Sequence, residues 1–154
     1  ILKQTKSDKF NLILMGNIGK VQLHNILINR LEIIIKSNYI KDLKLLIRGL
    51  NGKKVEENFK SHHKVKNIGI VNTNKLLEVY DNKSITIVSL SSHISECAFP
   101  SRISTACSLS SPIIFITDKV KGNFVSKFIA ENEIGISIEK NYSDKKVIYE
   151  LEYY

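Results

Sequence analysis

The stretch FNLILMGNIGKVQLHNILINRLEIII, residues 10–35, predicts a strand, a turn and a helix in succession. Residues 10–15 form a short apolar run, and Gly16-Asn17-Ile18-Gly19 closes it. Apolar residues then recur at spacings of three and four, which marks one face of a helix from about residue 20 to residue 37. A strand that passes through a short turn into an amphipathic helix is the repeating unit of α/β proteins.

The rest of the chain repeats this unit. Further strands are predicted at residues 43–47, 65–71, 85–90, 112–117 and 134–138. Helices are predicted at residues 53–61, 73–80, 100–109, 123–132 and 144–150, and residues 91–98 are expected to form a loop. The helix at 73–80 is expected to turn Leu76, Leu77 and Tyr80 inward.

The strand patterns indicate the kind of sheet. They lack a clear alternation of apolar and polar residues, which is typical of parallel strands buried on both faces. Short strands separated by helices favour right-handed crossovers. We therefore expect an α/β fold, a Rossmann-like doubly wound parallel sheet of about six strands with helices on both faces.

The composition restricts the class of protein and of partner. At 154 residues the chain has the size of one domain, and no apolar run reaches the length of a membrane-spanning helix. Its two cysteines are too few for a disulfide framework or a zinc site, and they fit a reducing compartment such as the cytoplasm. The net charge of +8 favours an anionic partner, either nucleic acid, an anionic membrane face or a phosphorylated ligand.

The start of the chain indicates a fragment. Ile1 is the first residue, charged residues stand where a signal peptide has its apolar segment, and a strand-like run begins at Phe10. We interpret residues 1–154 as a single domain cut from a longer protein.

The loop after the first strand carries candidate phosphate-binding residues. Gly16 and Gly19 would let backbone N–H groups approach a phosphate at a helix start, and Lys20 would add a positive charge. A tight turn that needs glycine for steric reasons explains the same residues equally well. The motif is not a dinucleotide fingerprint, because the third glycine is missing and Arg48 stands where an acid would bind the ribose.

A second candidate anion site is Pro100-Ser101-Arg102. Proline is pre-set for the start of a helix, whose first N–H groups attract anions. Arg102 could hold phosphate oxygens with its fork of N–H donors. The alternative is a helix cap followed by one solvated arginine.

Taken in order, these motifs resemble those of GT-B glycosyltransferases of the family 4 type. Residues 100–103 (PSRI), followed without gaps by residues 112–114 (PII), are similar to the P-S-K/R-x…G-x-P-V/I-I segment of that family. Residues 16–22 (GNIGKVQ) resemble the G-N-x-G-x-x-Q opening of its C-terminal domain. Residues 47–49 (IRG) fall at its strand–G-x-G, and residues 130–135 (AENEIG) resemble its E-x-x-x-G stretch. The resemblance covers nearly the whole chain.

The resemblance implies the nucleotide-sugar-binding half of a retaining glycosyltransferase. Such an enzyme moves a sugar from a nucleoside-diphosphate donor to a hydroxyl acceptor in polysaccharide or glycan synthesis, without a metal or cofactor. An N-terminal domain, absent from residues 1–154, would supply most of the acceptor site. The implied partners are a nucleotide sugar, that missing domain and, through a lipid-linked acceptor, the inner face of the membrane.

The resemblance also implies roles for particular residues. The base would lie against the backbone around residues 70–72, and the diphosphate between the first loop and the helix start at Pro100. Glu96 is expected to face the donor sugar as a catalytic residue. The expected donor-binding residues are Gly16, Asn17, Gly19, Lys20, Arg48, Gly49, Ile70, Val71, His93, Ala98, Phe99, Pro100, Ser101, Arg102 and Thr105.

The sequence departs from the family pattern at a pair of glutamates. Thr105 takes the place of the Glu that holds the ribose, and Cys97 takes the place of the other, with Glu96 beside it. A degenerate GT-B domain that acts as a non-catalytic binding or assembly module is therefore the alternative function. A nucleic-acid binder is not favoured, because the sequence has neither a recognition-helix motif nor interleaved aromatic and basic residues.

Overall fold

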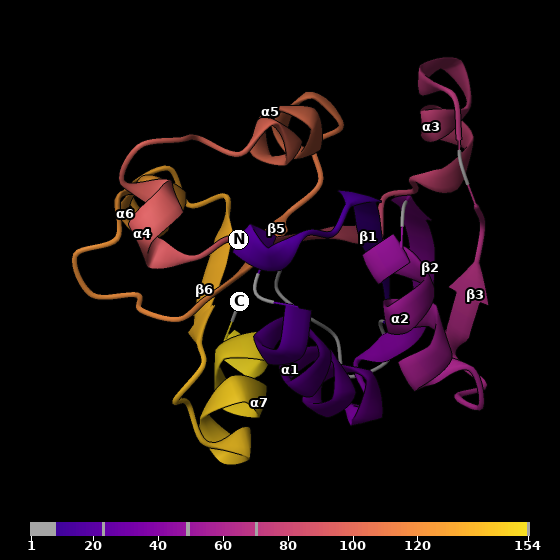
Figure 1. Cartoon of the computed structure of the whole chain (residues 1–154), viewed down its shortest axis with the longest axis horizontal. Helices are drawn as coiled ribbons and strands as arrows, with labels where there is room; N and C mark the ends of the chain where they lie inside the picture. Colours follow the sequence, from indigo (N-terminus) through magenta and orange to yellow (C-terminus); the bar gives the residue numbers. More distant parts are fainter. Residues whose placement is uncertain (1–8, 23, 49, 70, 154) are drawn as a thin grey trace.

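The computed structural model describes residues 9–22, 24–48, 50–69 and 71–153. Its strands form a six-stranded parallel sheet in the order β3-β2-β1-β4-β5-β6 (Figure 1). The strands are β1 (Phe10–Asn17), β2 (Ile40–Arg48), β3 (Val65–Asn67), β4 (Ser84–Ser89), β5 (Ile113–Thr117) and β6 (Gly135–Glu139). The predicted parallel sheet is confirmed, and its strand order is that of the Rossmann fold.

β1 lies in the middle of the sheet because its side chains are apolar on both faces. Leu12, Ile13 and Leu14 are fully buried, and the strand pairs with β2 on one edge and β4 on the other. Burial of each such side chain contributes about 1.5–3 kcal/mol, so apolar runs of this kind take the central positions. β3, with the sequence VKN, is more exposed and forms an edge.

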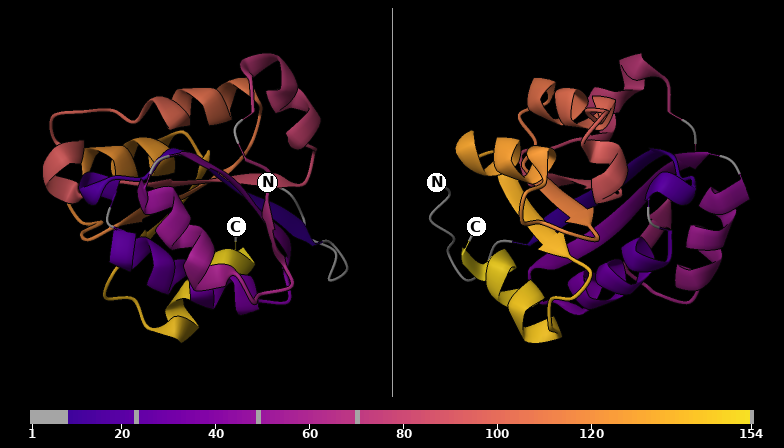
Figure 2. Two further views of the ribbon diagram at one scale, coloured as in Figure 1. Left: turned by 45° about the vertical axis from the view of Figure 1, so that its right-hand side comes forward. Right: turned by 60° about the vertical axis from the view of Figure 1, so that its left-hand side comes forward.

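Helices cover both faces of the sheet, as predicted (Figure 2). The buried side chains of α1, α2 and α7 join one core cluster with the sheet. Buried side chains of α5 and α6 and partly buried ones of α3 pack in two clusters on the opposite face. The helical segments are η1 (Lys20–Gln22, a 3-10 turn), α1 (His24–Lys36), α2 (Leu50–Phe59), α3 (Thr73–Val79), α4 (Ser92–Ser95), α5 (Ser101–Ser108), α6 (Phe124–Glu131) and α7 (Asp144–Tyr153).

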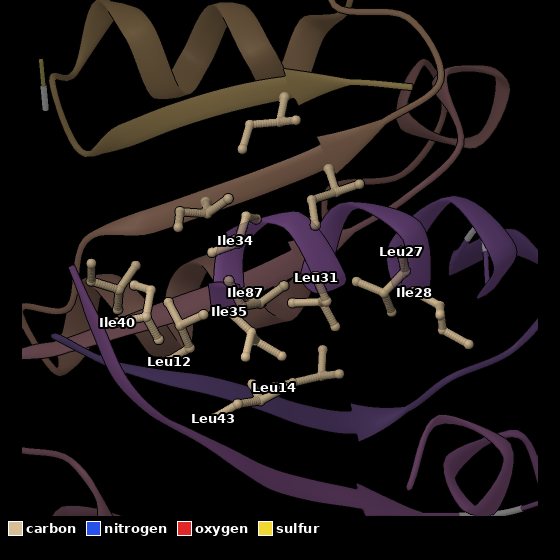
Figure 3. Packing of buried hydrophobic residues seen from close by; sticks show 14 of the residues in the cluster. Leu12, Leu14, Leu27, Ile28, Leu31, Ile34, Ile35, Ile40, Leu43 and Ile87 are labelled. Carbon is tan, nitrogen blue, oxygen red and sulfur yellow. The ribbon is translucent and has the colours of Figure 1, made fainter. Parts of the chain in front are cut away.

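The larger core cluster forms between α1 and the sheet. Leu27, Leu31 and Ile34 recur at helical spacing and are fully buried against Leu12 and Leu14 of β1 (Figure 3). The three- and four-residue periodicity of the opening stretch therefore predicted the buried face of this helix correctly.

Two predicted boundaries near the ends of strands are wrong. The helix expected from about Lys20 is divided, because residues 20–22 form a separate 3-10 turn and α1 begins only at His24. The strand expected at residues 65–71 ends at Asn67, whose side-chain oxygen accepts a hydrogen bond from the N–H of Gly69 at 2.8 Å. Gly69 has a φ of +74°, which turns the chain away from the sheet.

Two further local predictions are also wrong. Leu77 is 70% exposed, and only Leu76 and Tyr80 of the three residues expected to point inward pack against the sheet. The segment expected to be a loop contains the helix α4. Helices as short as α3 and α4 have few turns. Periodicity therefore cannot reveal their apolar face or show that they are helices.

Gly135, in the E-x-x-x-G stretch, starts β6 at a point where the backbone of β5 is very close. A Cβ added at Gly135 would overlap the carbonyl oxygen of Ile113, its partner in the sheet, and would lie 2.8 Å from the carbonyl carbon. Because the obstructing atoms are backbone, the strand itself would have to move. Gly122 offers a contrast, because a Cβ there meets nothing within 4 Å although its φ is +77°.

We predict that Gly135→Ala lowers the free energy of unfolding by about 3 kcal/mol or more, because it separates β6 from β5. Gly122→Ala is the matched control and should cost only about 1–2 kcal/mol, from its positive φ. Urea unfolding followed by circular dichroism measures both. Equal losses in the two variants would contradict the close approach of β6 to β5.

Candidate functional site

The candidate site lies where the winding of the sheet reverses. β1 lies between β2 and β4, so the connections that follow β1 and β4 lead away in opposite directions. In open parallel sheets a ligand binds beyond the carboxyl ends of the strands at such a point. The loops after β1 and β4 are also the loops that hold most of the predicted donor-binding residues.

The loop after β1 is held in place by Gln22. The side-chain oxygen of Gln22 accepts a hydrogen bond from the N–H of Gly19 at 2.6 Å, and its backbone oxygen accepts one from the Ser89 hydroxyl at 2.8 Å. The N–H of Ser91 also donates to the oxygen of Val21 at 2.9 Å. The η1 turn is thereby fastened to the end of β4, and a Gly19 amide that could bind phosphate is already occupied.

Arg102 connects this first loop to the start of α5. Its Nη2 donates a hydrogen bond to the oxygen of Asn17 at 2.5 Å. Gly16 has a φ of +92°, and a Cβ built there would lie 2.9 Å from Arg102 Nε. The positive φ favours glycine at residue 16, and the missing Cβ leaves room for the guanidinium in this position. The two loops that the sequence predicted to share a diphosphate do meet, through this contact.

The charge of Arg102 has no acidic partner among the residues that the structure describes. Burial lowers the pKa of the Arg102 guanidinium, and no carboxylate acts on it in the opposite sense. An arginine nevertheless keeps its charge at neutral pH. Pro100 is the N-cap of α5 and offers no side-chain hydrogen bond to the first turn, so the partial positive charge of the helix start adds to that of Arg102.

A pocket of about 250 Å³ opens beside Arg102. Its walls come from η1, from the end of β4, from Ile94 of α4 and from residues 98–102. They therefore include the predicted donor-binding residues Ala98, Phe99, Pro100, Ser101 and Arg102. The pocket therefore combines an apolar wall with one partly buried cation at a helix start, which is an arrangement suited to an anionic ligand with an apolar part.

The residues predicted to address the sugar and ribose lie outside these walls. His93 and Glu96 are exposed on α4 and at its C-cap. Thr105 lies one turn along α5, where its hydroxyl donates to the oxygen of Ser101 at 3.3 Å. That hydroxyl is consequently engaged with its own helix.

The remaining predicted residues are spread over the neighbouring loops. Lys20 is exposed at the start of η1, and Val71 is half-buried against the core cluster under α3. Arg48 is the last residue of β2, and the placement of its side chain is outside the described part of the chain. Gly49 and Ile70 lie outside the described residues.

Sequence reasoning missed a set of polar contacts that fixes α4. The Asp118 carboxylate accepts a hydrogen bond from the N–H of Ser92 at 2.6 Å, at the first residue of α4. At the other end of α4, the Ser95 hydroxyl accepts one from the Asn123 side chain at 2.7 Å. Asn123 also caps α6 by accepting a hydrogen bond from the N–H of Ser126 at 3.0 Å. The loop after β5 thus positions the helix that carries His93 and Glu96.

Asp118 has a lowered pKa. Burial by itself raises the pKa of this carboxyl, but hydrogen bonds from the backbone N–H and hydroxyl of Ser92 and from Thr117 outweigh it and hold the pKa below its usual range. The ionised carboxylate is therefore the form that binds the start of α4.

No protein-family model and no curated protein matches this sequence, but solved structures match its fold. One is the C-terminal domain of the glycosyl transferase group 1 family protein LpcC from Francisella tularensis, with a TM-score of 0.65 and 15% identity over 95% of this chain and 75% of that chain. Another is the catalytic domain of cholesterol-α-glucosyltransferase from Helicobacter pylori, with a TM-score of 0.59 and 19% identity over 93% of this chain and 86% of that chain.

A third is the lipopolysaccharide outer core galactosyltransferase WaaB, with a TM-score of 0.54 and 12% identity over 97% of this chain and 46% of that chain. The chain thus has the fold of the C-terminal domain of GT-B glycosyltransferases, and it spans less than half the length of WaaB.

No helix in the described part of the chain is long and apolar enough to cross a membrane. Within the same part, no three His, Cys, Asp or Glu residues are grouped as a metal site.

We predict that Asp118→Asn lowers stability by about 1 kcal/mol at pH 7, because the charge-assisted bond to Ser92 is lost. The folded-state pKa of Asp118 is depressed, so its contribution is complete above the unfolded-state pKa and disappears as the pH falls through the folded-state value. The difference between wild type and variant should therefore begin to shrink below about pH 4.5. Urea unfolding at several pH values measures it.

Glu78→Gln is the control for the loss of one charge, because Glu78 is exposed on α3. If the difference in stability between the wild type and Asp118→Asn grew on acidification, the role assigned to the ionised Asp118 carboxylate would be wrong.

Proposed function

We propose that the chain is the nucleotide-sugar-binding domain of a retaining glycosyltransferase that transfers a sugar to a hydroxyl acceptor in polysaccharide or glycan synthesis. One observation carries this proposal: the partly buried guanidinium of Arg102 lies at the start of α5, against Gly16 and Asn17, with no acidic partner in the described structure. The likeness in fold to three solved glycosyltransferases supports it.

The diphosphate of the donor is the ligand that suits this arrangement. A guanidinium has five N–H donors, and the contact with Asn17 accounts for one of them. The first-turn N–H groups of α5 supply further donors beside it. When the bond between sugar and diphosphate breaks, the leaving group gains negative charge. Fixed positive groups that face this charge lower the barrier without any reorganisation.

The sugar, ribose and base of the donor are assigned from the positions of the residues predicted to bind them. Exposed Glu96 would face the sugar, Thr105 would contact the ribose, and Lys20 and Arg48 would add positive charge around the phosphates. The base would lie near Val71, at the end of the neighbouring loop. No metal or cofactor is part of this proposal.

The acceptor site belongs to a second domain in this proposal. The chain alone is then expected to bind a nucleoside diphosphate weakly and to transfer nothing. The protein would work in the cytoplasm, where nucleotide sugars are the donors, and at the inner membrane face when its acceptor is carried on a lipid.

A degenerate GT-B domain that serves in assembly is the second candidate. Thr105 favours it, because a hydroxyl stands where a carboxylate would hold the ribose, and that hydroxyl donates to Ser101 instead. Turnover of a nucleotide sugar by the full-length protein would exclude this candidate.

We predict that Arg102→Ala weakens binding of UDP or GDP about 10- to 100-fold, because charge-assisted hydrogen bonds worth about 1.5–3 kcal/mol are lost. Isothermal titration calorimetry with both diphosphates measures the effect. Lys53→Ala removes one charge from the exposed face of α2 and is the matched control. Urea unfolding of Arg102→Ala separates weaker binding from loss of the fold. No binding by the wild type at millimolar concentration, or unchanged binding by Arg102→Ala, would remove the donor-site assignment.

We predict that Gln22→Glu weakens diphosphate binding about tenfold, because a carboxylate at the pocket wall repels the ligand. Stability should be retained, since a glutamate can still accept the hydrogen bond from Gly19. Gln22→Ala, which releases the Gly19 amide without adding charge, should bind at least as tightly as the wild type. The same calorimetric titration compares the three proteins, and equal affinities for the Glu and Ala variants would place the diphosphate elsewhere.

A further inference from the structure

The pocket beside Arg102 is lined mostly by apolar residues. Val21 and Phe99 both line it, and each is 41% exposed. Leu90 lines it from the end of β4, and Ile94 lines it from α4, where it packs against the same core cluster as Leu90. Segments far apart in the sequence, η1 and the chain from β4 to α5, therefore border one hollow with apolar side chains.

Three backbone N–H groups along this wall are already hydrogen-bonded within the chain. The N–H of Leu90 donates to the oxygen of Ile116 at 3.1 Å. The N–H of Ile94 donates to the oxygen of Ser91 at 3.1 Å, and the N–H of Ala98 donates to the oxygen of Ile94 at 2.9 Å. A ligand hydroxyl placed against these residues would lose its water without gaining a hydrogen bond from any of the three groups. That loss weakens binding, whereas an apolar ligand group gains from the same wall.

Some polar side-chain atoms of the pocket are engaged in the same way. The Ser89 hydroxyl donates to the backbone oxygen of Gln22, and the side-chain oxygen of Gln22 accepts a hydrogen bond from the N–H of Gly19. The side-chain nitrogen of Gln22, with its two N–H donors, and the Ser101 hydroxyl complement the guanidinium of Arg102. The pocket therefore suits a ligand that combines a phosphate, one or two polar atoms and an apolar end.

We infer that the sugar of the donor carries a 2-acetamido group, whose acetyl methyl packs against Val21, Leu90 and Ile94. The C2 substituent is attached next to the anomeric carbon, which bears the diphosphate. It is therefore the ring substituent closest to a diphosphate held at Arg102, and the side-chain nitrogen of Gln22 donates to its acetyl oxygen. This inference rests on the proposed function, because it names the class of sugar in the same donor.

Two other classes of sugar fit this wall less well. A plain hexose presents a 2-hydroxyl there, which meets backbone N–H groups that are already occupied. A 6-deoxy sugar also has a methyl group, but C5 and the ring oxygen separate that group from the carbon that bears the diphosphate. The pocket, of about 250 Å³, is smaller than those that hold drug-sized ligands, which suits a single sugar residue.

The first experiment compares UDP, UDP-glucose and UDP-N-acetylglucosamine by isothermal titration calorimetry on this chain. We expect UDP-N-acetylglucosamine to bind about tenfold more tightly than UDP-glucose, because a methyl group is buried and no hydroxyl is desolvated at the wall. Should the chain bind GDP rather than UDP, N-acetylglucosamine 1-phosphate and glucose 1-phosphate give the same comparison without a base.

Saturation-transfer NMR on the acetylated sugar locates the contact. The acetyl methyl should receive the largest saturation of all the sugar protons, because it lies against the apolar wall. Larger saturation at the ring protons or at C6 would overturn the inference, even if the acetylated sugar binds more tightly.

Val21→Thr tests the wall directly, because the two side chains are nearly isosteric and Val21 is partly exposed. The added hydroxyl should lower the ratio of the two sugar affinities about threefold. Val120→Thr makes the same change in the loop after β5, outside this pocket, and should keep the wild-type ratio. Urea unfolding of both variants checks the fold, and equal changes of the ratio in the two variants would contradict the packing of the methyl against Val21.

The outcomes separate this inference from the proposed function. If neither UDP nor GDP binds, the proposed function fails and the inference fails with it. If a diphosphate binds but the glucose and N-acetylglucosamine forms bind equally, only the inference fails. Tighter binding of GDP-fucose than of GDP-mannose, without a preference for the acetylated sugar, would assign the wall to a 6-methyl group and would also overturn the inference.

Discussion

The burial of β1 on both faces and both edges is the constraint on which the rest of the structure depends. The chain can leave a strand in this position only at the ends of the strand. At the carboxyl end of β1 it turns at Gly16, which has a positive φ. The same glycine leaves room for the guanidinium of Arg102, which ties the turn to α5. The packing of the central strand and the geometry of the candidate site thus have one common origin.

The central sheet could be predicted because its signals are local. Short, mostly apolar runs without clear alternation predicted β1, β4 and β5, and helical spacing predicted the buried face of α1. The errors lie where an element is short or where its environment decides the outcome. α4 has a single turn, and the short helix α3 packs Leu76 and Val79 on the core while Leu77 stays exposed. Periodicity carries no information at that length.

The candidate site was predictable only in outline, for a related reason. Ordered motifs indicated that the loop at Gly16 and the helix start at Pro100 belong together, and Arg102 does join them. The contacts that hold α4 could not be found in this way. Asp118 and Asn123 act on Ser92 and Ser95, more than twenty residues away, and nothing in their spacing marks the pairing. Long-range polar contacts of single side chains leave no periodic trace in a sequence.

Phe99 links the pocket beside Arg102 to the aromatic side chains of α6. Its ring touches Phe128 on one side, while the residue lines the pocket beside Arg102 on the other. The segment that carries it is held between α4, fixed by Asp118 and Asn123, and α5, fixed by Arg102. A ligand in this pocket would therefore contact a segment that is held at both of its ends.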